Sequence, residues 1–116
     1  AADLCVFPSI YEPFGIVSLE AMSMAKPVVV GAQGVVGFKE QVVSNGPDQN
    51  GIHVNGNNPA DIAWGIISAV EDPQRKLQLG QNGRKKVLQE FSWDAIAKNT
   101  IKVYNELLES QKPKKP

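Results

Sequence analysis

The sequence predicts an α/β fold in which helices cover a parallel sheet. Two short apolar runs, Leu4–Phe7 and Pro27–Gly31, have the length and β-branched content of buried strands. Between them, Gly15–Ala25 carries apolar residues at helical spacing. A strand, a helix and a second strand in direct succession form a βαβ unit. Its strands are expected to be parallel and its crossover right-handed.

The next part of the chain alternates between loop, strand and helix signals. Residues 33–50 are rich in glycine and amides, which predicts a loop with one helical turn around Lys39–Val43. Gly51–Val54 reads as a third short strand. Asn58 is a good N-cap and Pro59 a good first helical residue, so a helix is expected to begin there.

Three helices are expected after the third strand. The first of these helices is expected to bury the face that carries Ile62, Ile66, Ala69 and Val70. Asp72–Pro73 ends this helix and opens a second, which runs to about Glu90. Ser92 is expected to cap the last helix. The side chains of this helix that are expected to face inward are Trp93, Ile96, Ala97, Thr100, Ile101, Tyr104, Leu107 and Leu108.

Three strands alone make a thin parallel sheet. Buried parallel strands need neighbours in the sheet and helices on both faces. We therefore expect the C-terminal half of a doubly wound, Rossmann-like domain, or such a domain without its preceding strands. Residues 1–110 are expected to form this unit, and the basic, proline-rich residues 111–116 a disordered tail.

The composition is that of an ordinary globular protein, with 42% hydrophobic and 21% charged residues. Twelve basic and 12 acidic residues give a net charge of zero, which argues against nucleic acid or an anionic membrane as partner. The single cysteine, Cys5, excludes an internal disulfide and favours a buried thiol in a reduced, cytoplasmic chain. No apolar run has the length of a transmembrane segment. The chain opens without methionine, so its start resembles the interior of a longer protein.

The segment Tyr11–Gly15 is the first candidate for a functional site. It lies between the first strand and the first helix, at the sheet edge where parallel α/β proteins bind ligands. The first N–H groups of a helix have no internal partner and together carry about half a positive charge. They can therefore bind a phosphate without lysine. Gly15 is expected to keep the approach clear, because a Cβ would hold the ligand away from the backbone.

Two carboxylates, Glu12 and Glu20, flank this helix start. Like charges repel, so neither is expected to touch a phosphate. A carboxylate can instead accept hydrogen bonds from two neighbouring hydroxyls, as found on sugars. The pair could bracket a diphosphate, one holding a hexose and the other a ribose. The alternative is structural: a glutamate near a helix start gains about 0.3–1 kcal/mol from the dipole without any ligand, and this spacing arises by chance in many helices.

The surrounding motif favours the ligand-binding reading. The stretch "FPSIYEPFGIVSLEAMSMAKPVVV" resembles the signature segment of the retaining GT-B glycosyltransferases of the GT4 type, which include glycogen and sucrose synthases and bacterial mannosyltransferases. "GIHV", "NNPADIAWGI" and "EFSWDAIAKNTIKVYNELL" resemble later parts of the same family. The resemblance covers nearly the whole chain and leans toward glycogen-synthase-like members. It implies the C-terminal, donor-binding part of a GT-B enzyme.

The resemblance also implies roles for individual residues. Glu12 matches the glutamate that contacts the donor sugar and is the implied catalytic residue, acting by positioning or by charge stabilisation near the anomeric carbon. Glu20 matches the glutamate that binds the ribose hydroxyls. The turn whose amides meet the sugar and diphosphate is matched by Phe14, Gly15, Ile16 and Val17. Ser9 and Tyr11 lie in the flanking loop and are expected to line the nucleotide pocket.

The implied reaction transfers a hexose, with retention, from a nucleoside-diphosphate sugar to a saccharide acceptor such as an α-glucan. The family's basic pair, its base-contacting strand and its acceptor-binding N-terminal domain are expected to precede Ala1, so this fragment alone should be inactive. No Asp-x-Asp pair is present, and neither a metal nor another cofactor is expected. Gly34 and Glu40 match a further family loop only with a shift. Two alternatives remain: a nucleotide-sugar epimerase of the same architecture, and a non-catalytic binding module.

Five other residues and one basic run are expected to be structural. His53 is the only histidine, but it lies in a short strand where the family has an aliphatic residue. Trp64 and Trp93 are at helical core spacing, which favours packing over sugar stacking. Met22 and Met24 are expected to fill gaps in the core. The basic run Gly83–Lys86 is expected to lie on a solvated helix face.

Overall fold

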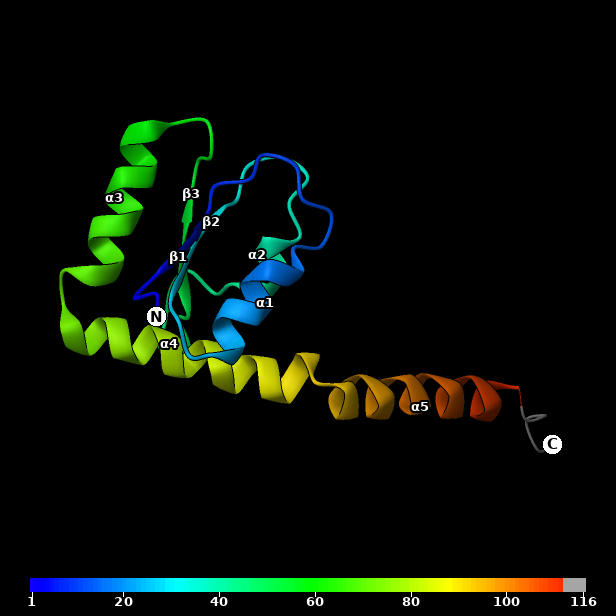
Figure 1. Ribbon diagram of the computed structural model, residues 1–116. Coiled ribbons are helices and arrows are strands. Elements are labelled where there is room, and N and C mark those ends of the chain that lie inside the picture. Colours follow the sequence, from blue (N-terminus) through cyan, green and yellow to red (C-terminus); the bar gives the residue numbers. More distant parts are fainter. Residues whose placement is uncertain (112–116) are drawn as a thin grey trace.

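The computed structural model describes residues 1–111 (Figure 1). The expected disordered tail therefore lies, apart from Gln111, outside the described residues. Three strands form one parallel sheet in the order β1-β2-β3. Their bounds are β1 Cys5–Phe7, β2 Val28–Gly31 and β3 Gly51–Val54. Cys5 pairs with Val28, and Val28 pairs with Gly51. The predicted strands and their parallel direction are confirmed.

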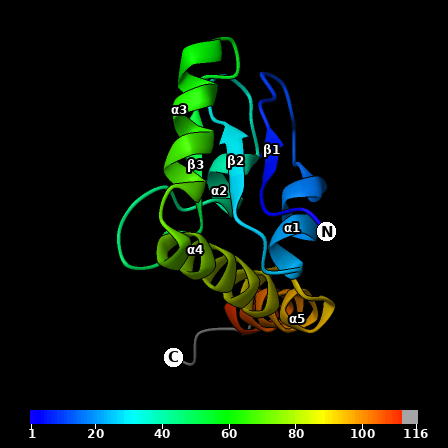
Figure 2. The same cartoon turned by 60° about the vertical axis from the view of Figure 1, so that its left-hand side comes forward.

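Helices cover both faces of the sheet and one end of it (Figures 1 and 2). Their bounds are α1 Ile16–Ser23, α2 Phe38–Gln41, α3 Pro59–Val70, α4 Pro73–Lys86, the π-helical turn η1 Val87–Phe91, and α5 Trp93–Ser110. Helices α1 and α2 lie on one face, α3 lies on the other, and α4 runs beneath the amino ends of the strands (Figure 1).

The core has two halves, because side chains of the central strand β2 alternate between the two faces of the sheet. Val28 and Val30 pack toward α1 and α2, in a cluster that includes Met22 and Phe38. Val29 packs in the other cluster, with Ile52, Val54 and Ala69. All three valines of β2 are fully buried, as expected for a central parallel strand. Strand β1, at the sheet edge, is only half-buried, so the expectation of a buried Cys5 thiol is wrong.

The predicted caps of α3, α4 and α5 are correct. The Asn58 side chain accepts hydrogen bonds from the amides of Ala60 and Asp61. Asp72 caps α4 in the same way, through the amides of Gln74 and Arg75. The Ser92 hydroxyl accepts from the amide of Ala95 at the start of α5 (3.2 Å).

The buried face of α3 matches the predicted one in part, since Ala69 is buried and Ile62 packs against the core as expected. The buried residues of the helix are Gly65, Ser68 and Ala69, which are small and let the helix approach the sheet closely. Trp64 is 54% exposed and Val70 38% exposed, so the expectation that they pack in the core is wrong. Met24 is also exposed, because α1 ends at Ser23 and the chain turns away. Met22 alone of the two methionines fills the core.

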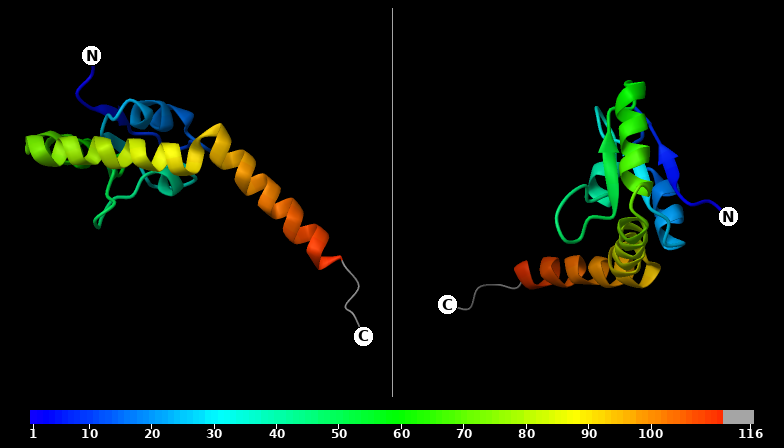
Figure 3. Two further views of the ribbon diagram at one scale, coloured as in Figure 1. Left: turned by 90° about the horizontal axis from the view of Figure 1, so that it is seen from below. Right: turned by 90° about the vertical axis from the view of Figure 1, so that its left-hand side faces the viewer.

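Helix α5 is the largest departure from the sequence expectation. It continues away from the α/β body and gives the molecule principal extents of 63 × 28 × 24 Å (Figure 3). None of its residues is buried, and Trp93 is 86% exposed. The residues expected to face inward, from Trp93 to Leu108, therefore do not join the core of this chain. The helix expected to reach Glu90 is α-helical only to Lys86 and continues as the π-helical turn η1.

Candidate functional site

The candidate site lies at the carboxyl end of the sheet, where the segment 8–15 runs from β1 to α1. Glu12 holds this segment against the loop that follows β2, because the two form an isolated parallel bridge at Val36. The Glu12 amide donates to the carbonyl of Val35 (3.1 Å), and the Gly37 amide donates to the carbonyl of Glu12 (2.7 Å). The backbone of Glu12 is thereby fixed while its side chain remains half-buried.

Gly37 allows the two loops to come this close. A Cβ at position 37 would lie 2.5 Å from the carbonyl oxygen of Pro13 and 2.7 Å from the Cα of Phe14. Both atoms belong to the backbone and cannot move aside like a flexible side chain. The glycine therefore sets the distance between α2 and the Pro13–Phe14 turn.

Gly15 caps α1 in the left-handed conformation, with φ 83° and ψ 55°. A Cβ there would lie 2.1 Å from Cε1 of Phe38, a fully buried ring. The sequence predicted that glycine is needed to leave room for a ligand. The structure gives another reason: the missing Cβ would point into the core, and the positive φ favours glycine independently of any ligand.

The amino end of α1 leaves three backbone amides available. No side chain caps this end. Within the described residues, the N–H groups of Gly15, Ile16 and Val17 donate to no acceptor, whereas the Ser18 amide donates to the carbonyl of Gly15 (3.2 Å). Phe14, Ile16 and Val17 are 51%, 60% and 39% exposed, whereas Gly15 between them is buried. Free amides at the positive end of a helix form a site for an anion.

The carboxylates of Glu12 and Glu20 are available for a ligand. Glu20 is exposed on α1, and neither carboxylate forms a hydrogen bond or ion pair among the described residues. Glu20 borders an apolar hollow of about 340 Å³ between α1 and the start of α5, whose other lining residues are Phe14, Ile16, Leu19, Ser23, Val87, Phe91, Trp93 and Ile96. This hollow could not be predicted from the sequence, because Phe91 and Trp93 are distant in the chain from α1.

The two flanking residues of the predicted site occupy different surroundings. Tyr11 is 70% exposed. Ser9 is half-buried, and its backbone lies against the end of β2, where a Cβ on Gly31 would come 2.0 Å from the Ser9 carbonyl oxygen.

Two buried polar residues beside the turn escaped the sequence analysis. Ser18 and Gln41 are both fully buried and hydrogen-bonded to each other. The Gln41 amide nitrogen Nε2 donates to the carbonyl oxygen of Phe14 (2.5 Å). A serine inside the apolar run of α1 and a glutamine directly before two valines are the signals that could have revealed them, since buried polar groups need partners.

His53 is structural in this chain. Its ring nitrogen Nε2 lies 2.8 Å from the carbonyl oxygen of Val42, and since a carbonyl only accepts, Nε2 carries the hydrogen. Burial lowers the pKa of His53 below 6.5, the Val42 hydrogen bond opposes this, and the charge of Lys39 lowers the pKa further. In residues 1–111, no group of three or more His, Cys, Asp or Glu side chains is placed to hold a metal ion.

The basic run at the end of α4 contacts other parts of the chain rather than forming only a solvated face. Gly83 is buried, and the Lys86 ammonium pairs with Glu90 (3.2 Å). Arg84 donates to the carbonyl of Ser23 at the end of α1. Of the helices within residues 1–111, none combines the length and the apolar character needed to cross a membrane.

Comparisons with known proteins identify the fold and the family. The family model described as glycosyl transferases group 1 matches residues 1–86. The chain is 40% identical to the α-maltose-1-phosphate synthase of Mycolicibacterium smegmatis, over 92% of this chain and 28% of that enzyme. It therefore spans little more than a quarter of the length of this relative.

Solved structures agree with the family model. The sucrose-phosphate synthase of Thermosynechococcus elongatus superposes with a TM-score of 0.76 and 36% identity, covering 95% of this chain and 26% of that one. HepE of Anabaena, in complex with UDP-glucose, superposes with a TM-score of 0.75 and 29% identity, covering 91% of this chain and 28% of that one. The Rossmann-like sheet with flanking helices is thus part of a GT-B architecture. The chain belongs to the glycosyl transferases group 1 family.

Proposed function

We propose that this chain contributes the donor site of a glycosyltransferase that moves a hexosyl group from a nucleoside-diphosphate sugar to a saccharide acceptor with retention of configuration. The observation that carries the proposal is the amino end of α1. Three free amides, from Gly15 to Val17, lie between the half-buried Glu12 and the exposed Glu20. This arrangement fits an anion with a hydroxyl-bearing group on each side.

In the proposed reaction the bond between the anomeric carbon and the β-phosphate oxygen breaks, and a bond from that carbon to an acceptor hydroxyl oxygen forms. The acceptor's proton leaves with the nucleoside diphosphate. Negative charge develops on the departing phosphate oxygen, where the amides of Gly15, Ile16 and Val17 would stabilise it. These amides are fixed by the fold, so little reorganisation is needed as the charge grows.

Glu12 is the proposed catalytic residue. Its backbone is held by two hydrogen bonds to the loop after β2, so its side chain is presented to the donor sugar from a rigid position. It would orient the sugar hydroxyls and stabilise positive charge near the anomeric carbon. Glu20, one turn into α1, would accept hydrogen bonds from the two ribose hydroxyls.

The remaining proposed contacts belong to the edges of the donor pocket. Phe14 would lie against the sugar and diphosphate, and Ser9 and Tyr11 would line the nucleotide pocket. The HepE complex with UDP-glucose supports a nucleotide sugar as donor, since that protein shares this fold at 29% identity. The likeness to an α-maltose-1-phosphate synthase and a sucrose-phosphate synthase supports a saccharide product. We assign the protein to the cytoplasm and expect no metal in the reaction.

The test uses the intact protein that contains this chain. It is supplied in turn with UDP-glucose, ADP-glucose and GDP-mannose, with and without an α-glucan acceptor, and the release of nucleoside diphosphate is measured. We expect release that depends on the acceptor and is unchanged by EDTA. NMR of the product is expected to show the anomeric configuration of the donor.

The other outcomes identify the alternatives. Conversion of the donor to its epimer without transfer would indicate an epimerase. Donor binding without turnover, with every acceptor tried, would indicate a binding module. Loss of activity in EDTA, restored by a divalent cation, would contradict the expected independence of metal.

A further inference from the structure

Gln41 connects α2 to the turn that opens α1. It is fully buried, yet neither of its two side-chain hydrogen bonds stays within its own helix. Nε2 donates to the carbonyl oxygen of Phe14 (2.5 Å), and Oε1 lies within hydrogen-bonding distance of the Ser18 hydroxyl. The Ser18 hydroxyl also lies 3.1 Å from the carbonyl oxygen of Gly15. The Phe14 carbonyl thus accepts from Gln41, and the Gly15 carbonyl accepts from the Ser18 amide (3.2 Å). The single hydrogen of the Ser18 hydroxyl serves either Gln41 Oε1 or the Gly15 carbonyl.

These contacts determine where the turn's amides point. The described chain has no cis peptide bond, and in a planar trans peptide the N–H points opposite to the C=O. The Phe14 carbonyl faces Gln41, so the Gly15 N–H is directed away from Gln41. The Gly15 carbonyl faces Ser18, so the Ile16 N–H is directed away from the helix body. Both amides lack acceptors within the described residues.

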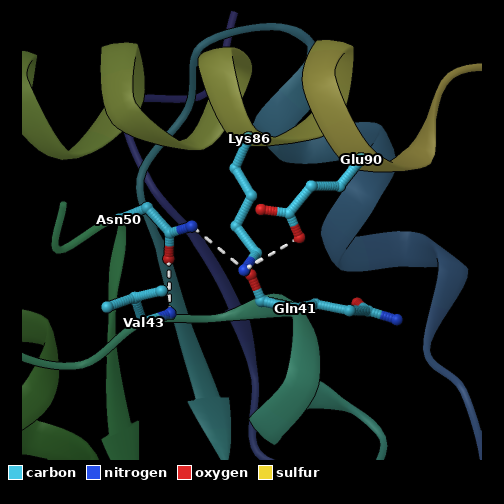
Figure 4. Close-up of polar contacts among 5 residues, drawn as sticks. All are labelled: Gln41, Val43, Asn50, Lys86 and Glu90. Atoms are coloured by element: carbon cyan, nitrogen blue, oxygen red, sulfur yellow. Dashed lines mark hydrogen bonds and ion pairs between the residues drawn. The ribbon is translucent and has the colours of Figure 1, made fainter. Parts of the chain in front are cut away.

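Gln41 is itself held from the other side. The Asn50 amide Nδ2 donates to the main-chain carbonyl of Gln41 (3.3 Å), and the Val43 amide donates to Asn50 Oδ1 (2.8 Å). Figure 4 shows the Gln41 side chain extending away from Asn50 while its main-chain oxygen faces the Asn50 amide. Asn50 is fully buried and directly precedes β3. A continuous set of hydrogen bonds thus runs from the sheet through α2 to the turn.

We propose that Gln41, together with Ser18, is a positioning residue that fixes the Phe14–Gly15 turn so that its amides face an incoming diphosphate. This inference rests on the proposed function for the identity of the ligand. Gln41 does not touch the ligand; it acts through the orientation of two peptide groups.

A role in core packing alone would not require this residue pair. Phe38 on α2 and Val42 directly after it are buried and apolar. Replacing two hydrogen-bonded partners together by apolar groups of similar shape can be nearly neutral for stability. A buried amide and hydroxyl add directional contacts that an apolar pair lacks. The Gln41 amide ends on the Phe14 carbonyl, whose peptide carries the free Gly15 amide, and the Ser18 hydroxyl holds the Gln41 amide group in place.

The experiment compares variants of the intact protein that contains this chain. Gln41→Met keeps the length of the side chain and removes its hydrogen bonds. Gln41→Glu keeps the acceptor toward Ser18 but, when ionised, cannot donate to Phe14. Ser18→Ala with Gln41→Met removes both partners together. Val42→Ala is the matched control, because it opens a gap in the core directly after α2 and removes none of the turn's hydrogen bonds. Binding of UDP and UDP-glucose is measured by calorimetry, and hydrogen exchange is followed at the Ser18 amide.

We expect the dissociation constant for UDP to rise about tenfold in both Gln41 variants and in the double variant, as loss of one well-oriented hydrogen bond to the diphosphate would produce. KM for the donor should rise more than kcat falls. The Ser18 amide should exchange about tenfold faster. Val42→Ala should lower the unfolding midpoint at least as much as Gln41→Met while changing UDP affinity less than twofold.

The positioning role is overturned if Gln41→Met binds UDP like the wild type, or loses no more affinity than Val42→Ala at the same loss of stability. If the wild type binds none of the nucleotides, the proposed function is wrong. Exchange at the Ser18 amide then still decides whether Gln41 orders the turn. Unchanged exchange in Gln41→Met would refute the ordering itself.

Discussion

Glu12 and Val36 lie side by side in a two-residue parallel bridge, although they are on separate loops. The bridge uses both backbone groups of Glu12, with hydrogen bonds of 3.1 and 2.7 Å. A carboxylate on such a fixed backbone can act without first being ordered by substrate, which lowers the entropy lost in reaching the transition state.

Replacing Glu12 by Gln should therefore reduce turnover more than donor binding. The amide keeps the shape of the side chain and removes the negative charge near the anomeric carbon. In the intact protein we expect kcat to fall about 10²-fold or more, with the dissociation constant for UDP-glucose changed less than fivefold. Steady-state kinetics and calorimetry measure the two quantities. Glu71→Gln, at the exposed end of α3, is the control. Equal activity of both variants would remove Glu12 from the chemistry.

Glu20 is expected to bind the two ribose hydroxyls. Glu20→Ala should weaken UDP binding about tenfold, because two hydrogen bonds to a charged acceptor are lost. The same substitution should leave the affinity for 2′,3′-dideoxy-UDP unchanged, since that ligand has no hydroxyls to lose. Calorimetry with both ligands on both proteins forms a thermodynamic cycle. If Glu20→Ala weakens both ligands equally, the carboxylate acts elsewhere than on the ribose.

Gly15 is expected to be sensitive to any side chain. Gly15→Ala adds strain at positive φ and a contact with the buried Phe38 ring, whereas Gly46→Ala adds only the strain, because φ at Gly46 is 82° and nothing lies within 4 Å of its Cβ position. We expect Gly46→Ala to lower the unfolding free energy by about 1 kcal/mol and Gly15→Ala by about 3 kcal/mol. Urea denaturation measures both. Equal losses would mean that Phe38 moves aside freely.

The local elements were predictable because their signals are local. The β-branched run Val28–Val30, the caps Asn58 and Asp72, and the Ser92 start of α5 each depend on a few neighbouring residues, and all were correct. The Glu12–Val36 bridge was not predictable. It depends on the path of a loop that the sequence describes only as glycine-rich.

The environment of each helix was harder to predict than the helix itself. An amphipathic pattern marks a face that some protein surface covers, but it does not say whether that surface belongs to the same stretch of chain. The apolar face of α5 has strong helical periodicity and remains exposed here. For α3, small residues rather than large ones mark the contact with the sheet, since Gly65 lies against Val29 and Val54. Ser18 and Gln41 were missed because each is polar and their contact joins positions 23 residues apart.

Shortening α5 should hardly affect the stability of the α/β body. Residues 101–110 are all exposed. Their one ion pair joins Lys102 to Glu106 at 3.9 Å; both side chains are exposed, so the pair contributes little to stability. The chain shortened to end at Thr100 should unfold in urea with a free energy within about 0.5 kcal/mol of that of the 116-residue chain. A loss above about 2 kcal/mol would show that this part of α5 is covered in solution.

Stability should fall on mild acidification because of His53. Its folded pKa is lowered, by burial first, so the folded state binds the proton less well than the unfolded state, whose pKa is near 6.5. The contribution of the neutral ring is therefore fully present above pH 6.5 and is lost as the pH falls from there through the folded pKa. Because His53 is the only histidine of the chain, the slope of unfolding free energy between pH 5 and 7 can be assigned to it.

Two variants of the 116-residue chain test this assignment. His53→Gln should flatten the slope, since it removes the titrating group and keeps a donor for the Val42 carbonyl. Lys39→Gln should reduce the slope only in part, because it removes the cation that adds to the effect of burial. Urea denaturation across the pH range gives the slopes, and NMR titration of the imidazole gives the pKa directly. A folded pKa at or above 6.5, or an unchanged slope in His53→Gln, would contradict the linkage.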